Sequence, residues 1–233
     1  AYIELSKNKE ERDRILNVVA HDLRSPLSGI AGISKMMRTD ENVSDSSKEM
    51  FILIEQNAES TLRLINDLMQ TNISSIDQYQ FEEVDLNKLV QHTLQMLVFT
   101  AKEKQIIIEV NITKNPIVIR VDKDKINRVI SNLVTNAVKF STRGSIMHVS
   151  LTKSESYAEI IVRDNGIGIP ENLQGKIFDL FTTAKRKGTA GEKSFGLGLA
   201  ICKKIIEVHS GQIKLESKDG KGSSFIVQLP LNT

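Results

Sequence analysis

The chain has 233 residues, of which 40% are hydrophobic and 26% charged, a size and composition typical of a soluble globular protein with one large or two modest domains. The formal net charge of +2 and the lack of a dense Lys/Arg patch among aromatic residues give no support for nucleic-acid binding. The single cysteine, Cys202, excludes a disulfide within the chain and a cysteine-cluster zinc site.

Neither a signal peptide nor an apolar run of the ~18 residues needed to span a membrane is visible in the sequence. A lone cysteine fits a reduced, cytoplasmic compartment. The sequence begins with Ala1-Tyr2-Ile3 rather than Met and passes directly into a helical pattern. We therefore expect a cytoplasmic fragment, with any sensor or membrane anchor in a part of the protein that is not present.

Two heptad patterns open the chain. Residues 3–38 predict one long helix, and a polar turn at 39–45 separates it from a second helix. The apolar seam of the first helix contains Leu16, Val19, Leu23, Pro26, Ile30, Ile33 and Met37, and that of the second contains Met50, Ile54, Asn57, Thr61, Leu64 and Leu68. The pattern favours an antiparallel helical hairpin, bent near Pro26, that dimerises into a four-helix bundle.

The heptad pattern ends near residue 73, and the periodicity of the remaining chain is mixed. We expect a helical hairpin at 1–75, a linker at 76–84 and a second domain at 85–233. In the second domain, helices are expected at 86–104, 124–140 and 198–209, and strands at 106–112, 117–121, 146–153, 158–163, 213–217 and 223–228. This order predicts a two-layer α+β sandwich. Residues 182–194, rich in Thr, Lys and Gly, predict a mobile loop.

The first helix carries a histidine beside an acid. His21 lies two residues from both Val19 and Leu23, roughly 200° around the helix, so we expect it to point away from the seam. A neutral imidazole is a competent nucleophile, and Asp22 could act as its base. Arg24 and Ser25 add a cation and a hydroxyl. The alternative is an ordinary surface histidine on a solvated face.

The helix expected at 124–140 carries Asn132, Asn136 and Lys139 at spacings that place them on one face. Amide oxygens suit Mg²⁺, which keeps few protein ligands, and a lysine suits phosphate. The alternative is simple polar decoration of an exposed helix face.

Two glycine loops complete the candidate nucleotide site. Asp164-Asn165-Gly166-Ile167-Gly168-Ile169-Pro170 follows a strand, and Phe195-Gly196-Leu197-Gly198-Leu199-Ala200 opens a helix, where phosphate can bind. Asp164 can accept a hydrogen bond from the amino group of adenine. Lys185, Arg186 and Lys187, in the mobile loop between them, could reach phosphates as a lid does. Read singly, each glycine loop could be a turn, and the three cations a solvated charge run.

Taken together, these segments resemble the cytoplasmic core of two-component sensor histidine kinases. In family order they are an H box (His21–Pro26), an N box (Asn132–Phe140), a first glycine box (Asp164–Gly168), an F box (Phe178–Phe181) and a second glycine box (Gly196–Leu199). The resemblance covers about residues 10–230. It implies a dimerisation and phosphotransfer hairpin followed by a GHKL-type ATP-binding domain.

The resemblance also implies residue roles. His21 is autophosphorylated from ATP and passes the phosphoryl group to an aspartate of a response regulator; Asn136 coordinates Mg²⁺ and Asp164 binds adenine. The candidate catalytic residues are His21, Asp22, Ser25, Asn132 and Lys139. The candidate nucleotide-binding residues are Asn132, Asn136, Lys139, Phe140, Asp164, Gly166, Gly168, Ile169, Lys185, Arg186, Gly196, Leu197, Gly198 and Leu199.

Two departures from the family pattern occur in the H box. Asp22 stands where many members carry glutamate, and Ser25 stands where threonine or asparagine is frequent, at the position that orients water for dephosphorylating the regulator. His92, His148 and His209 match no catalytic motif, so we interpret them as structural. The competing interpretations of the chain are a pure ATPase of the same fold and a non-catalytic dimeric scaffold.

Overall fold

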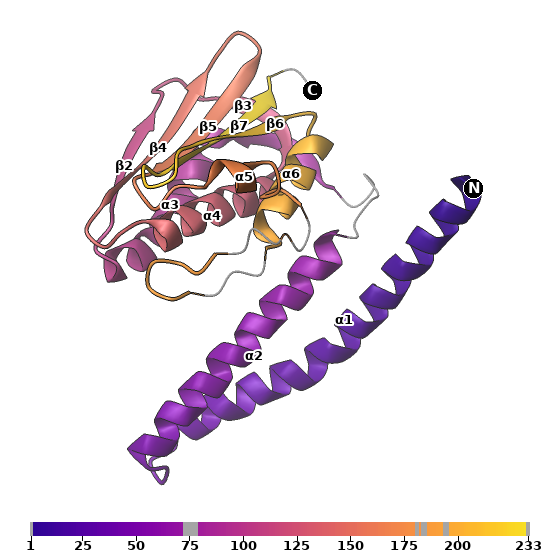
Figure 1. The fold of residues 1–233 in the computed structure, drawn as a ribbon, viewed down its shortest axis with the longest axis vertical. Helices are drawn as coiled ribbons and strands as arrows, with labels where there is room; N and C mark the ends of the chain where they lie inside the picture. Colours follow the sequence, from indigo (N-terminus) through magenta and orange to yellow (C-terminus); the bar gives the residue numbers. More distant parts are fainter. Residues whose placement is uncertain (1, 72–78, 180–181, 183–185, 193–195, 232–233) are drawn as a thin grey trace. The chain divides into compact units, whose positions relative to one another are not determined.

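The computed structural model describes residues 2–71, 79–179, 182, 186–192 and 196–231. For residues 2–18, 21, 60, 63–64 and 66–71 it describes the backbone alone. The chain folds as two compact units, Ala1–Ser74 and Ser75–Thr233, and Figure 1 shows an all-helical first unit and a mixed second unit. In the part of the chain described, no helix is long and apolar enough to cross a membrane.

The first unit is the expected helical hairpin, made of α1 (Tyr2–Thr39) and α2 (Asp45–Thr71). α1 continues through Pro26 and curves along its length (Figure 1). In the connecting turn, Asp40 Oδ1 accepts a hydrogen bond from the Asn42 amide at 2.8 Å. Ser44 Oγ accepts from the Ser47 amide at 3.3 Å, which satisfies one of the unpaired donors at the start of α2.

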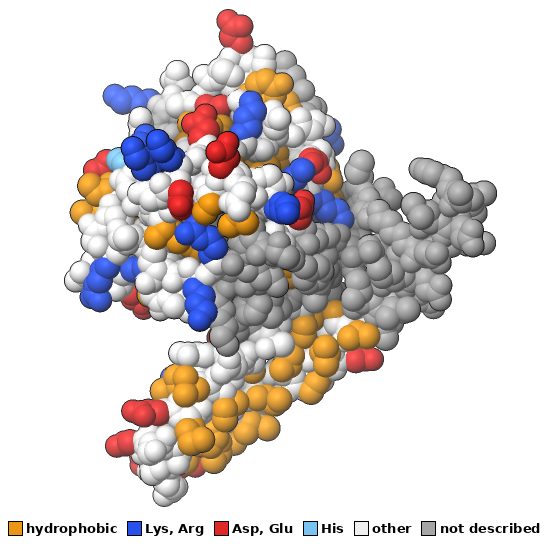
Figure 2. Space-filling view, viewed as in Figure 1, with side chains coloured by type: hydrophobic (Ala, Val, Ile, Leu, Met, Phe, Trp, Pro, Cys, Tyr) orange, Lys and Arg blue, Asp and Glu red, His pale blue; other side chains and the backbone are white. Residues whose placement is uncertain are grey.

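Part of the expected seam is exposed in the single hairpin, and the side chains of Leu16, Leu64 and Leu68 lie outside the described residues. Val19, Leu23 and Ile33 are 49%, 46% and 61% exposed. Among the hairpin side chains that the structure describes, the buried ones are Ala20, Ser34, Ala58 and Ile65. Three of these four are small, and small side chains let two helices approach closely, while many of the larger apolar side chains of the hairpin stay exposed. Figure 2 shows these apolar side chains gathered along the hairpin.

The second unit is built on a five-stranded sheet. Its strands, in spatial order, are β2 (Ile107–Ile112), β4 (Ile146–Lys153), β5 (Tyr157–Asp164), β7 (Ser223–Pro230) and β6 (Gln212–Ser217). β2 and β4 pair in parallel, and the other neighbours pair antiparallel. The sheet is therefore mixed, with a single parallel pair at one edge.

Three helices cover one face of this sheet: α3 (Leu86–Glu103), α4 (Lys123–Phe140) and α6 (Gly198–Val208) (Figure 1). The strands alternate accordingly, because a sheet covered on one face buries every second side chain. The buried set includes Met147, Val149, Leu151, Ala158, Ile160, Val162, Phe225, Val227 and Leu229. The predicted two-layer α+β sandwich is confirmed.

Two elements were not expected from the sequence. β1 (Phe81–Asp85) pairs antiparallel with β3 (Val118–Asp122), and α5 (Glu171–Gln174) is a single turn. Four of the five residues of β1 lie in the 76–84 range that was expected to be a linker, and the pairing of β1 with β3 attaches it to the second unit. The strand reads Phe-Glu-Glu-Val-Asp, which lacks an apolar alternation strong enough to identify a strand.

His209 joins the beginning of the second unit to the end of α6, in the structural role expected for it. Its Nε2 accepts a hydrogen bond from the Asp122 amide at 2.9 Å, so Nδ1 carries the proton and donates to the Ile205 carbonyl at 2.7 Å. The rings of Tyr79 and Phe81 lie 5.7 and 5.0 Å from the imidazole.

Acidification should destabilise the second unit through His209. Burial lowers the pKa of His209 below its ordinary value, against opposing effects of the Ile205 carbonyl and Asp122. Folding therefore favours the neutral imidazole, and the stability it contributes above about pH 6.5 is lost as the pH falls through the folded-state pKa. Thermal denaturation followed between about pH 7.5 and 5.5 should show a falling Tm.

The variant His209→Gln, which carries no titrating imidazole, should flatten this dependence. The variant His148→Gln is the matched control, because His148 is half-buried on the sheet and pairs with Glu109 at 3.1 Å. If the Tm of His209→Gln fell with pH as steeply as that of the wild type, another titrating group would be the cause of the pH dependence.

Candidate functional site

The outward side of α4 carries the three polar residues that the sequence selected. Asn132, Asn136 and Lys139 are half-buried. The other side of the helix is buried through Ile126, Val129, Ile130, Leu133, Val134, Ala137 and Val138. Because the buried side fixes the rotation of α4, the two amides and the ammonium stay together on the side that faces the loops.

Three loops far apart in the sequence meet α4 at its polar side or at its C-terminal end. The Cβ position of Gly198 lies 3.7 Å from the Asn132 side chain. The Ile167 amide donates to the Phe140 carbonyl at 3.2 Å, and the Thr189 amide donates to the Lys139 carbonyl at 3.0 Å. The structure therefore brings both glycine boxes and part of the expected lid to the N-box helix.

Asp164 lies buried at the end of β5, in the first glycine loop. Its Oδ1 accepts hydrogen bonds from the Gly166 amide at 2.8 Å and the Ser223 amide at 3.3 Å. Burial raises the pKa of this carboxyl, while the two amide donors act in the opposite direction. Because these bonds hold Oδ1, the carboxylate has a fixed orientation in the loop.

The loop between β6 and β7 braces the first glycine loop, and sequence reasoning missed its contribution. The Ile169 amide donates to Ser217 Oγ at 2.9 Å, and Ser217 Oγ lies 3.0 Å from Ser223 Oγ. The Gly220 amide donates to the Ile167 carbonyl at 2.9 Å. The available signal was the Gly220-Lys-Gly222-Ser223 sequence, which was interpreted as a simple hairpin turn.

The second glycine loop leads into α6. Gly196 has φ of +76°, Leu197 is buried, and Gly198 and Leu199 are the first residues of the helix. Among the residues described around this end, no side chain caps the helix. The first backbone amides of α6 are therefore suited to an anionic ligand, as phosphate sites at helix N-termini are.

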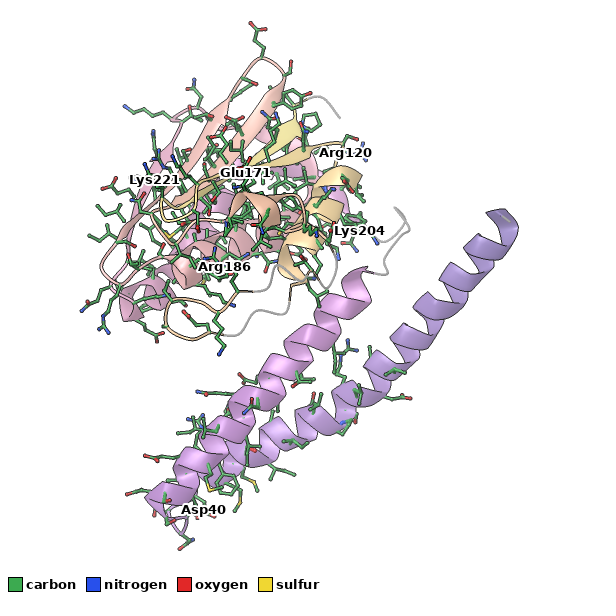
Figure 3. The ribbon with its side chains drawn as sticks, viewed as in Figure 1. Asp40, Arg120, Glu171, Arg186, Lys204 and Lys221 are labelled. Atoms are coloured by element: carbon green, nitrogen blue, oxygen red, sulfur yellow. The ribbon has the colours of Figure 1, made fainter. Side chains whose placement is uncertain are left out.

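The cations of the expected lid have different positions. Arg186 extends toward the first glycine loop, and its guanidinium donates to the Gly168 carbonyl (Figure 3). Lys187 is exposed, and Lys185 lies outside the described residues. The sequence predicted a mobile loop at 182–194, of which residues 183–185 and 193–194 lie outside the described part. In the described part, Thr189 is hydrogen-bonded to the end of α4.

The H box lies within α1. Asp22 and Ser25 are exposed and Arg24 is half-buried, while the side chain of His21 lies outside the description. Helix geometry places positions 21 and 25 on the same face, because residues four apart are neighbours on a helix surface. Asp22 follows His21 directly in sequence, and its side chain is exposed.

The electrostatics of the α4 face depend on neighbouring charges. Burial lowers the pKa of Lys139, Glu192 opposes that shift, and Lys104 adds to it. In the part of the chain that the structure describes, no three His, Cys, Asp or Glu residues form a metal-binding group. The side-chain amide oxygens of Asn132 and Asn136 on α4 lie beside the candidate phosphate site. They suit an ion such as Mg²⁺, which takes its remaining ligands from phosphates and water.

Comparison with known families assigns both units. Residues 11–74 match the His Kinase A (phospho-acceptor) domain, and residues 121–233 match the family of histidine kinase-, DNA gyrase B-, and HSP90-like ATPases. The chain belongs to the histidine kinase family. His21 lies inside the first match, and the three loops around α4 lie inside the second, so the second unit of this histidine kinase core is its ATP-binding domain.

Relatives of this histidine kinase core include larger sensor kinases. Sensor protein kinase WalK of Staphylococcus aureus is 32% identical over 227 residues, covering 95% of this chain and 54% of WalK. Sensor histidine kinase TmoS of Ectopseudomonas mendocina is 32% identical over 220 residues, covering 92% of this chain and 22% of TmoS. The chain thus spans about a fifth to about half of these relatives.

Among solved structures, full-length ShkA in complex with AMPPNP has the same fold. The TM-score is 0.78 at 21% sequence identity, and the match covers 93% of this chain and 45% of ShkA. The two-unit architecture of the histidine kinase core is therefore shared with a structure whose sequence has diverged widely.

Substituting Gly168 should destabilise the ATP-binding domain. Gly168 has φ of +60°, and a Cβ there would overlap the Lys218 carbonyl. Gly168→Ala should lower the free energy of unfolding by about 2–3 kcal/mol, the sum of backbone strain and displacement of the braced loop. Chemical denaturation measures this change.

Gly175→Ala is the matched control, because Gly175 has φ of −66° and nothing lies within 4 Å of its Cβ position. It should change the unfolding free energy by no more than about 0.5 kcal/mol. Equal effects of the two substitutions would show that the close approach of the two loops contributes nothing to stability.

Proposed function

We propose that this chain is the core of a sensor histidine kinase, which transfers the γ-phosphoryl group of ATP to His21 and then to an aspartate of a response regulator. The observation that carries the proposal is the combination in one chain of a phospho-acceptor domain match containing His21 and an ATPase match containing the α4 site. ATP hydrolysis alone does not require a phospho-acceptor domain such as the first unit.

The proposed reaction needs a nucleophile, a base and positioning. A nitrogen of the His21 imidazole forms a bond to phosphorus as the bond from phosphorus to the β-phosphate oxygen breaks, and ADP leaves. The proton lost from the ring passes to Asp22, whose exposed carboxylate adjoins His21 in sequence. Phosphoryl transfer of this kind depends chiefly on alignment and charge neutralisation.

The nucleotide's base is assigned to the first glycine loop. The Asp164 carboxylate would accept a hydrogen bond from the amino group of adenine. The Gly166 and Ser223 amides hold this carboxylate in place. Gly166, Gly168 and Ile169 would form the adjoining backbone wall, and Phe140 contacts this loop through its carbonyl.

The phosphates are assigned to α4 and the second glycine loop. Asn136, with Asn132 beside it, would hold Mg²⁺, and the bound ion would neutralise phosphate charge. Lys139 and the lid cations Lys185 and Arg186 would add positive charge, and the backbone of Gly196, Leu197, Gly198 and Leu199 would bind phosphate oxygens. Arg186 would have to leave the Gly168 carbonyl to do so.

The partners follow from the exposed surface of the hairpin. Val19, Leu23, Ile30, Ile33, Met50 and Leu53 are exposed apolar side chains on its two helices, and pairing with a second copy in a four-helix bundle would bury them. The response regulator would dock where His21 is displayed. Ser25, on the same face, would orient water if the core also dephosphorylates the regulator. ATP and the regulator place these reactions in the cytoplasm, whether or not the whole protein is anchored in a membrane.

Replacing His21 should abolish autophosphorylation. With γ-³²P-labelled ATP, the wild-type chain should acquire an acid-labile, base-stable label, as phosphohistidine does, and His21→Ala should acquire none while still binding nucleotide. His92→Ala is the control, because His92 is exposed on α3. Label that survives in His21→Ala would contradict the assignment, and ATP hydrolysis without any label would favour the pure ATPase.

Replacing Asp164 should weaken nucleotide binding. Asp164→Asn keeps an oxygen for the Gly166 and Ser223 amides but offers an NH₂ group where adenine needs an acceptor. The loss should be about 1–3 kcal/mol, or roughly 5- to 150-fold in the Kd for AMP-PNP by calorimetry. Asp124→Asn, at an exposed position on α4, should bind normally. Unchanged affinity in Asp164→Asn would favour a non-catalytic scaffold.

A further inference from the structure

The ammonium of Lys104 is almost fully enclosed at the C-terminal end of α4. Its side chain is only 12% exposed. Nζ donates to the carbonyls of Val138 at 3.0 Å and Lys139 at 2.7 Å, and to Glu192 Oε1 at 3.0 Å. An ammonium has three donors, so these three contacts use all of them. Two of the acceptors are carbonyls of the last turn of α4, where the helix dipole favours a cation.

Residues 188–192 form a compact turn on the same end of α4. The Gly188 amide donates to the Glu192 carbonyl at 2.9 Å, and the Thr189 amide donates to the Lys139 carbonyl at 3.0 Å. Thr189 Oγ1 donates to the Ser141 carbonyl at 2.5 Å. Glu192 Oε2 accepts from the Ala190 amide at 2.9 Å. The carboxylate of Glu192 thus closes the turn with one oxygen and binds Lys104 with the other.

The Lys139 side chain packs against this turn. A Cβ on Gly188 would lie 2.7 Å from Lys139 Cγ and would overlap the Glu192 carboxylate, so a side chain at this position would displace one of them. Besides the effect of burial, Glu192 raises the pKa of Lys139 and Lys104 lowers it. The turn therefore packs against the stem of Lys139 and supplies Glu192, one of the charges that act on its ammonium.

We propose that Lys104 and Glu192 form a clasp that holds residues 188–192 on the end of α4 and thereby positions Lys139 for the nucleotide phosphates. This proposal rests on the function proposed above, because it takes Lys139 as a phosphate-binding residue. Lys104 and Glu192 are positioning residues that act through Lys139. Neither needs to contact the nucleotide.

The direction in which two substitutions change the Kd for nucleotide distinguishes a clasp from a simple charge effect. Lys104→Met removes a positive charge near the phosphates, which would weaken their binding through space, whereas Glu192→Gln removes a negative charge, which would strengthen it. Opening the clasp weakens binding in both cases. A clasp also predicts non-additivity, because either change alone opens it.

The experiment measures the Kd of AMP-PNP with Mg²⁺, and of adenosine, by calorimetry in the whole chain. Lys104→Met and Glu192→Gln should each raise the Kd for AMP-PNP by about tenfold, and the double variant should be no weaker than the weaker single variant. Adenosine has no phosphates, so its Kd should not change. In a Lys139→Met background, Glu192→Gln should have no further effect on AMP-PNP.

Glu207→Gln is the matched control, because Glu207 pairs with Lys203 at 3.9 Å in an exposed pair on α6, and its affinity should equal that of the wild type. Three outcomes would overturn the clasp alone. They are changes of opposite sign in the Kd for AMP-PNP of the two clasp variants, an unchanged Kd in Glu192→Gln, and a rise in Kd on Glu192→Gln that is as large in the Lys139→Met background as in the wild type. Lack of AMP-PNP binding by the wild-type chain would overturn the proposed function and the clasp with it.

Discussion

Burial of one side of α4 is the constraint from which the rest of the ATP-binding unit follows. Seven side chains of the helix are buried, which fixes its rotation, and the opposite side must then carry Asn132, Asn136 and Lys139. The loop at the start of α6 contacts that polar side, and the loops from β5 and the 186–192 segment contact the C-terminal end of α4. The sheet and its neighbouring helices thus act as a rigid support for one helix face and its surrounding loops.

Hydrogen bonds that involve backbone groups hold the first glycine loop to its neighbours. The first glycine loop is joined to α4 through the Phe140 carbonyl and to the β6–β7 loop through the Ile167 carbonyl and the Ile169 amide. Such close approach is possible only where side chains are absent, as at Gly166, Gly168 and Gly222. The glycines therefore serve two ends, because they let loops pack on one another and leave backbone amides available to a ligand.

Much of this architecture could be predicted from residue patterns, because the strongest patterns correspond to local structure. The helices carrying His21 and Asn136, the strand ending at Asp164 and both glycine boxes were all found in the sequence. The exposure of Val19 and Leu23 could not be predicted, since a heptad pattern does not tell which of two apolar faces closes the hairpin. Ser223, Lys104 and Glu192 were missed because their partners lie far away in the sequence, and β1 because its pairing with β3 is non-local.

The junction at His209 shortens the segment that was expected to link the two units. Tyr79, Gln80 and Phe81 contact His209 or Asp122, so residues 79–84 move with the ATP-binding unit. At about 3.4 Å per extended residue, their removal from the expected linker shortens the available tether by roughly 20 Å.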